Sequence, residues 1–262
     1  MASSKAPGLQ REQIDKAVSA LLKYVGSQKS DSKDLLEDEE YLYLNIALKK
    51  TPQPPKNPSP VRLPLPHPIY DSKNAEVCLF VKDHKGEGHK AAKLRVKQQK
   101  VAGVAKVIGV SKLKGKYEPF EAKRQLCNSY DLFIADDRVV PSLPKLIGKS
   151  FFKKKKVPIP VNLQTKDWSS QIQKALSGTY LHRNGGNCLS VRVAKNTMSQ
   201  ADCTDNIISV VEGAMEHIAK KWSNVLALHL KSVNSVALPV YQTLPAEQNT
   251  RITIDSKQCS LT

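Results

Sequence analysis

Two neighbouring carboxylates, Asp136 and Asp137, are best suited by residue type and spacing for acid–base chemistry. They follow an apolar run at residues 132–135 that is typical of a strand buried on both faces, and open α/β sheets often bind ligands at such strand ends. No nucleophile, metal-ligand histidine or second carboxylate cluster accompanies them in the sequence, which argues against a hydrolase. We expect both carboxylates to cap the helix predicted after the strand.

A phosphate-binding loop is a second candidate for chemistry. The triplet Gly148-Lys149-Ser150 is similar to the end of such a loop, but Leu143 stands where the first glycine is required. The triplet also follows a predicted helix instead of a strand. We therefore expect no nucleotide site and no cofactor.

Cysteine and histidine give no pattern for a metal site. The five cysteines are an odd count without a CxxC pair, which argues against a zinc site and a disulfide framework. Cys78 and Cys188 fall in predicted strands, where we expect them to be core residues. His84 and His89 lie in a lysine-rich turn and are expected to be solvated.

Positive charge is the strongest functional signal. The chain has 41 Lys and Arg against 24 Asp and Glu, a formal net charge of +17. Residues 82–124 contain thirteen Lys or Arg and four acids, and Phe151, Phe152 and a run of four lysines follow at residues 153–156. This excess predicts attraction to a polyanion, with nucleic acid as the first candidate.

A membrane surface is the alternative partner for a basic chain. The sequence has no apolar run long enough to span a bilayer and no lipidation motif, and the first five residues do not resemble a signal peptide. We expect a soluble, intracellular protein without a membrane partner.

Half-exposed elements are predicted near both ends of the chain. An amphipathic helix over residues 14–25 is expected to end near Gly26, and an acidic linker covers residues 31–40. Alternating apolar residues predict a strand at 42–48, and an edge strand is possible at 61–65. Further elements of this kind are a helix at 168–176, a strand at 189–193, a helix capped by Ser199 and a strand at 225–230.

The middle of the chain has a different pattern. Apolar runs at residues 77–81, 104–110 and 132–135 predict strands buried on both faces, and helices are expected at 91–99 and 119–128. A helix bearing Val139 to Ile147 should follow the third strand directly, and the chain should then leave in an extended form. This alternation predicts a parallel, doubly wound unit inserted into a split domain.

Residues 130–161 carry a specific resemblance. A strand, the sequence DDRVVP, the helix end LPKLIGK and a lysine run occur in this order, and a strand GNCLSVRV begins at Gly186. The chain resembles the large-subunit stalk ribosomal protein family called L-one, and especially its eukaryotic nucleolar branch of ribosome assembly factors. The resemblance covers about residues 14–241.

The resemblance implies an α/β fold of two domains. A split α/β sandwich of residues 1–72 and 157–243 would carry the main RNA site, and a Rossmann-like three-layer domain would occupy residues 73–156. Two hinge strands near residues 68–75 and 157–163 would join them, and residues 244–262 form a polar tail.

RNA-binding positions carried over from the family lie on the first strand and its neighbours. The lysine run supplies general phosphate attraction, whereas the sheet residues would recognise RNA shape. Taken singly, Tyr43 and Asn45 are as well explained as solvent-facing strand residues. The candidates are Tyr43, Asn45, Lys49, Lys153, Lys154, Lys155, Lys156, Arg192, Lys195 and Lys231.

Two departures separate this chain from the ribosomal members. Their Thr-Met-Gly turn is replaced by residues 232–236, and their glycine-rich loop by residues 151–156. The sequence therefore predicts a non-enzymatic nucleolar protein, monomeric within a large ribonucleoprotein, that binds pre-rRNA or rRNA beside assembly factors and ribosomal proteins. A structural stalk protein of the large subunit and, with less support, a nucleotide-dependent enzyme are the alternatives.

Overall fold

The structure is a computed structural model that describes residues 9–31, 40–52, 60–70, 76–83, 89–99, 101, 103–154, 156–183 and 185–243. The polar tail at residues 244–262 and most of the acidic linker lie outside this part of the chain. Strands within it form three sheets: an antiparallel four-stranded sheet, a two-stranded pair and a parallel four-stranded sheet. None of the described helices is both long enough and apolar enough to cross a membrane.

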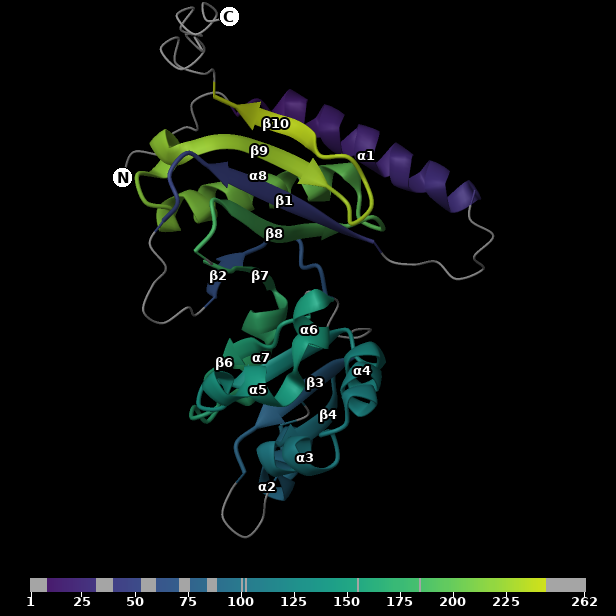
Figure 1. Ribbon diagram of the computed structural model, residues 1–262, viewed down its shortest axis with the longest axis vertical. Coiled ribbons are helices and arrows are strands. Elements are labelled where there is room, and N and C mark those ends of the chain that lie inside the picture. The colour runs from purple at the N-terminus through teal and green to yellow at the C-terminus, as the bar shows by residue number, and fades with distance from the viewer. Residues whose placement is uncertain are drawn as a thin grey trace, which may run out of the picture.

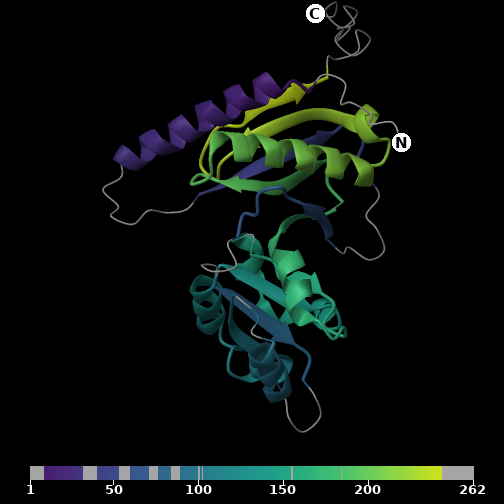
Figure 2. The ribbon, with the colours of Figure 1, turned by 180° about the vertical axis from the view of Figure 1, so that it is seen from behind.

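The antiparallel sheet is built from both ends of the chain, in the order β10-β9-β1-β8. Its two long helices pack on one face, and the described elements leave the other face without a helix (Figures 1 and 2). The elements are α1 (Arg11–Asp31), β1 (Tyr41–Leu48), β8 (Cys188–Lys195), α8 (Gln200–His217), β9 (Val225–Lys231) and β10 (Leu238–Gln242).

The period-two pattern of β1 sets which of its side chains are buried. Leu42, Leu44, Ile46 and Leu48 join the hydrophobic core under the helices, as the alternation predicted. The intervening residues therefore point to the open face. On α1 the predicted apolar positions 14, 18, 21 and 25 are buried, but the helix continues to Asp31, five residues beyond the expected end at Gly26.

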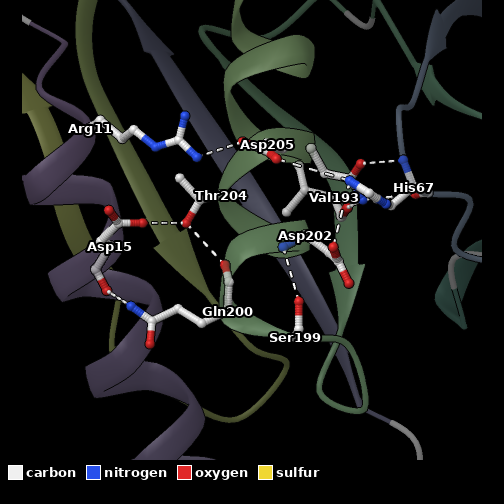
Figure 3. A network of polar contacts seen from close by, with 10 residues as sticks. Arg11, Asp15, His67, Val193, Ser199, Gln200, Asp202, Thr204 and Asp205 are labelled. Atoms are coloured by element: carbon white, nitrogen blue, oxygen red, sulfur yellow. Dashed lines mark hydrogen bonds and ion pairs between the residues drawn. The ribbon is translucent and has the colours of Figure 1, made fainter.

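Polar contacts join the two helices to each other (Figure 3). Arg11 Nη2 pairs with Asp205 Oδ1 at 2.8 Å, and Thr204 Oγ1 donates to Asp15 Oδ1 at 2.6 Å. Ser199 Oγ accepts a hydrogen bond from the Asp202 N–H at 3.2 Å, which confirms the predicted N-cap of α8.

A short pair of strands, β2 (Val61–Pro64) and β7 (Gly178–Leu181), lies between the two larger sheets (Figure 1). The edge strand at β2 was predicted, whereas β7 was not. Residues 65–70 follow β2, and hydrogen bonds of the buried Asn206 hold them against α8. Its side chain accepts from the His67 N–H at 3.0 Å and donates to the carbonyls of His67 at 2.9 Å and Val193 at 3.1 Å.

The parallel sheet has the order β4-β3-β5-β6 and confirms the predicted α/β class. Its central strands β3 and β5 are buried at every position, because helices lie on both faces. The strands are β3 (Val77–Val81), β4 (Val104–Gly109), β5 (Leu132–Asp136) and β6 (Ile159–Val161). The helices are α2 (Lys90–Gln98), α3 (Val110–Gly115), α4 (Phe120–Ser129), α5 (Leu143–Ile147), α6 (Lys149–Lys153) and α7 (Trp168–Leu176).

The segment after β5 differs from its prediction. Instead of one helix directly after the strand, a turn leads to a 3₁₀ turn at Val140–Ser142 and then to the five-residue α5. The buried Asp136 caps no helix, because its carboxylate accepts from the Arg138 side chain at 2.6 to 3.2 Å and from the Arg138 N–H at 3.2 Å. The Asp137 N–H bonds to the Val161 carbonyl, and no side-chain cap is formed at α5, so the capping hypothesis is wrong.

Three further elements were missed, namely α3, α6 and β10. The helix α6 ends at Lys153, the first lysine of the run that precedes the expected extended Pro-Ile-Pro segment. Cys78 is buried as predicted, but Cys188 is exposed at the start of β8, so its assignment to the core is wrong. His89 stands before α2, and His84 lies outside the described residues.

Candidate nucleic-acid interface

The open face of the antiparallel sheet brings four predicted residues together. Tyr43 on β1 is paired in register with Arg192 on β8 and with Lys231 on β9. Asn45, the next residue on this side of β1, is paired with Ser190 and His229. Because cross-strand partners have neighbouring side chains on the same face, these residues form one polar surface. We call it the sheet face.

Arg192 is the centre of an aromatic cluster on the sheet face. Its guanidinium carbon lies 4.1 Å from the ring centroid of Tyr41, 5.8 Å from that of Tyr43 and 6.0 Å from that of Tyr70. Arg192 Nη1 also donates a hydrogen bond to the Tyr70 hydroxyl. Cation–π contacts and a charged hydrogen bond therefore fix the orientation of a half-buried arginine.

A β-bulge explains how Lys195 reaches the same cluster. Residues three apart on a regular strand point to opposite faces, yet Lys195 Nζ and the Arg192 guanidinium both lie over the Tyr41 ring, with Nζ at 5.7 Å. The register of β1 and β8 shifts between Leu42 and Tyr43, which inserts one extra residue on β8. The bulge thus places both cations on the sheet face.

Burial alters the protonation chemistry of this cluster. It is the main cause that raises the pKa of Tyr41, and the neighbouring Tyr70 raises that pKa further. The Tyr41 hydroxyl therefore stays neutral up to a higher pH than that of an exposed tyrosine.

Lys49 marks the far end of the sheet face. It is exposed directly after β1, where its N–H donates to the Asn224 carbonyl at 2.8 Å. At about 3.3 Å per residue, the stretch of β1 from Tyr41 to Lys49 is roughly 25 Å long. The predicted sheet residues therefore form a stripe along one strand and its two neighbours.

The four lysines of the run are in different environments. Lys153 is exposed at the end of α6, and Lys154 Nζ donates to Asn128 Oδ1 at 2.5 Å. Lys156 Nζ donates to the Tyr130 carbonyl at 2.7 Å and the Cys127 carbonyl at 3.3 Å, at the end of α4. Lys155 lies outside the described residues.

The lysine run and the sheet face are electrostatically connected. Burial lowers the pKa of Lys156, and the positive charges of Lys154 and Arg192 lower it further. Arg192 is therefore close enough to Lys156 for their charges to interact. In Figure 1, α6 lies beneath β8, the strand that carries Arg192. The charge of Arg192 on the sheet face thus acts on one residue of the lysine run, Lys156.

The other candidates for chemistry have local structural contacts. Asp136 is held by Arg138, and burial, followed by the charge of Asp136, raises the pKa of Asp137. Gly148 has a φ of 74° and precedes α6, so its conformation ends α5 and begins the next helix. Neither group has a nucleophile or a histidine as a hydrogen-bonding partner among the described contacts.

The family model for the ribosomal protein L1p/L10e family matches residues 21–236, a range that begins within α1 and ends just before β10. The chain belongs to this family. The L-one resemblance inferred from residues 130–161 is thereby confirmed.

Relatives within the L1p/L10e family differ in their overlap with the chain. The mouse protein "Ribosomal L1 domain-containing protein 1" is 35% identical over 92% of this chain and 53% of its own length. A Schizosaccharomyces pombe protein, provisionally named as a ribosome biogenesis protein, is 34% identical over 87% of this chain and 64% of its own length. The large ribosomal subunit protein uL1 of Neurospora crassa is 27% identical over 86% of this chain and 94% of its own length. The chain thus spans about half of the mouse relative and less than two thirds of the fission yeast relative.

Two residues of the sheet face in this L1p/L10e family member were missed from sequence. Tyr41 shares the period-two face of Tyr43 and Asn45, so the alternation of β1 already contained the signal. Tyr70 is 122 residues from its partner Arg192 and lies outside any strand, so no local pattern indicates their contact.

Proposed function

We propose that this chain is a non-enzymatic RNA-binding protein of ribosome biogenesis, which binds pre-rRNA or rRNA in nucleolar pre-ribosomal particles. The observation that carries the proposal is the sheet face, a polar and basic surface that the described helices leave open (Figure 1). The net charge of +17 supports a polyanionic partner. The name of the mouse relative supports the family branch, and the name of the fission yeast relative supports the process.

We assign different roles to the two basic regions. Strand register fixes the relative positions of Arg192, Tyr43, Asn45 and Lys231. Such a fixed arrangement suits recognition of RNA shape. Lys153 is exposed and suits phosphate attraction, to which Lys154 and Lys155 contribute. The role of Lys156 is to hold the end of α4, because both of its described hydrogen bonds go to backbone carbonyls there.

The proposed domain organisation is a split domain of residues 1–72 and 157–243 with a Rossmann-like domain of residues 73–156 inserted. The antiparallel sheet from both chain ends supports the first unit, and the parallel sheet supports the second. The strand β6 pairs with β5, so the returning connection also forms the edge of the parallel sheet. We propose that the protein acts as a monomer among assembly factors and ribosomal proteins.

A structural large-subunit protein is the second candidate, because the Neurospora crassa uL1 match covers 94% of that protein. Sedimentation separates the two functions. An assembly factor will sediment with precursor particles and be absent from translating ribosomes, whereas a ribosomal protein will be present in both.

RNA binding is tested by titrating structured pre-rRNA fragments at several salt concentrations. If six to ten phosphates are contacted, affinity should fall by about 10³- to 10⁵-fold between 50 and 200 mM salt, through counterion release. A salt-independent dissociation constant would contradict the proposal.

Matched double variants test the division of roles. Lys153→Ala with Lys154→Ala should weaken binding to all fragments to a similar degree, whereas Asn45→Ala with Lys231→Ala should weaken only some of them. Leu94→Ala, on the exposed side of α2, is the control and should change neither. Equal losses on every fragment for both double variants would remove the division.

A further inference from the structure

Two helices on one side of the parallel sheet lie next to each other. A Cβ added at Gly148, just before α6, would lie 3.6 Å from Lys123 Cδ on α4. Near the other ends of these helices, Lys154 Nζ bonds to Asn128 Oδ1 at 2.5 Å. Because both contacts follow the same chain direction, α4 and α6 run alongside each other (Figure 1).

Each of these helices exposes a phenylalanine ring. Phe120, the first residue of α4, is 81% exposed, and Phe152 on α6 is 44% exposed. The neighbouring Phe151 is fully buried, so α6 is anchored by one ring and presents the next one to solvent. Burial of an apolar ring is favourable, and two exposed rings on adjacent helices therefore indicate a contact surface.

Basic residues flank both rings at helical spacing. Lys123 and Arg124 follow Phe120 by three and four positions, so they share its side of α4. Lys149, Phe152 and Lys153 have the same spacing on α6. Lys123 Nζ lies 5.7 Å from the Phe120 ring centroid. The α4–α6 surface consists of Phe120, Lys123, Arg124, Lys149, Phe152 and Lys153.

The charge of this surface favours an anionic partner. Four of its six residues are basic, and the adjacent acid Glu121 forms an exposed pair with Arg124 at 3.4 Å. Aromatic rings interleaved with cations are the arrangement with which proteins bind single-stranded nucleic acid, because bases stack on the rings and phosphates meet the cations. An apolar protein partner would not use the four cations in this way.

We propose that the α4–α6 surface binds unpaired nucleotides of RNA, with Phe120 and Phe152 stacking on bases and the lysines contacting adjacent phosphates. Phe120 precedes Lys123 by about one helical turn, while Phe152 lies toward the Asn128 end, so the rings contact different nucleotides. The inference rests on the proposed RNA-binding function and adds a second site with its own ligand class, separate from the sheet face.

The test uses the full chain and two probes, a short labelled oligouridylate and structured pre-rRNA fragments. Removing a stacked ring weakens binding by about 5- to 150-fold per base. The double variant Phe120→Ala with Phe152→Ala should therefore lose affinity for the oligouridylate, and tryptophan at both positions should restore it. Leu94→Ala removes another exposed side chain, 61% exposed on α2, and should have no effect.

Leucine at both positions separates stacking from apolar contact. Stacking requires a π-face, so the leucine variant should bind the oligouridylate as weakly as the alanine variant. Wild-type affinity for the oligouridylate in either variant overturns the proposal, and retained affinity in the leucine variant alone would show that the two side chains contact RNA by apolar burial and not by stacking on bases. Unchanged melting temperatures confirm that the variants are folded.

The two probes also separate this inference from the proposed function. If wild-type protein binds the structured fragments and the alanine variant binds the oligouridylate as tightly as wild type does, only the α4–α6 site is overturned. Wild-type protein that binds neither probe overturns the RNA-binding function itself.

Discussion

The sheet face and the α4–α6 surface both combine aromatic and basic side chains, but they hold them differently. On the sheet face, Tyr43 is 7% exposed and the Arg192 guanidinium lies over three rings. On the α4–α6 surface, Phe120 is 81% exposed and has one cation near its ring. The first arrangement is preorganised, whereas the second leaves its side chains free to adapt. We therefore expect RNA shape to be read by the sheet and unpaired segments by the helices.

The two surfaces also differ in the packing that holds them in place. The sheet face lies on strands whose other side packs on α1 and α8, and register fixes each side chain. The five-residue α6 depends on one buried ring, because Phe151 packs edge-on against Phe133 at a centroid distance of 4.8 Å. A long-range fold thus sets the geometry of the sheet face, whereas one half of the α4–α6 surface lies on a short helix with a single buried ring.

The largest effect is expected from Asn206→Ala, beneath the sheet face. The change leaves the His67 N–H and the carbonyls of His67 and Val193 without their partner. Each buried polar group without a hydrogen bond costs about 1–3 kcal/mol, so we expect the free energy of unfolding to fall by about 3 kcal/mol. Urea unfolding measures this value.

Ser209→Ala is the matched control for Asn206→Ala. Its hydroxyl donates to the Pro64 carbonyl at 3.1 Å, at the start of the same connecting segment, but from a half-buried position. A loss of no more than about 1 kcal/mol is expected. Equal losses of unfolding free energy in both variants would show that Asn206 has no special role in holding this segment against α8.

A smaller effect is expected from Arg192→Leu, within the sheet face itself. Removal of the guanidinium removes the hydrogen bond to the Tyr70 hydroxyl and one cation–π contact from each of three rings, of which Tyr41 and Tyr70 keep the contact with Lys195. We expect a loss of about 2 kcal/mol in the free energy of unfolding, together with weaker binding to the fragments that depend on Asn45 and Lys231.

Arg192→Lys tests whether charge or planarity matters. Lysine keeps the positive charge but cannot stack as a planar guanidinium, so it should restore only part of the stability and affinity lost in Arg192→Leu. Full restoration in urea unfolding and RNA titration would show that the sheet face is not preorganised as we describe.

Much of the fold could be predicted from the sequence, because burial leaves periodic patterns. Continuous apolar runs identified β3 and β5, and alternation identified β1 and its inward residues. Cys188 was assigned wrongly because its apolar residue type was considered instead of its position in the alternation. Cys188 shares the parity of Ser190 and Arg192, so the alternation already placed it on the sheet face despite its apolar type.

The remaining elements depend on contacts that local patterns do not contain. The lysine-rich α6 forms where Phe151 meets Phe133, eighteen positions earlier in the chain. Asp136 was expected to cap a helix, but its carboxylate accepts hydrogen bonds from Arg138 instead. The sheet candidates came from the family resemblance, and their cross-strand register explains why they lie together, whereas Tyr70 required the folded chain.

The smallest effect concerns Lys156, which belongs to the lysine run by sequence but to the scaffold by its contacts. Burial lowers the pKa of its amine in the folded chain, whereas the amine in the unfolded chain keeps a pKa of about 10.4. Between these values the unfolded state binds more protons, so this group makes the free energy of unfolding rise with pH. The rise should be below about 1 kcal/mol, because solvent screens a half-buried amine.

Lys156→Met removes this contribution, and the difference between the urea stabilities of wild type and variant from pH 8 to pH 11 measures it together with the coupled titration of Cys127, whose pKa the Lys156 charge lowers. Subtraction is needed because burial raises the pKa of Cys203 to about 11 and of Tyr180 to about 12, which lowers stability at high pH in both proteins. Lys153→Met should weaken RNA binding, since Lys153 is exposed. If Lys156→Met instead weakens RNA binding as strongly as Lys153→Met, at unchanged stability, then Lys156 contacts RNA and the lysine run acts as one unit.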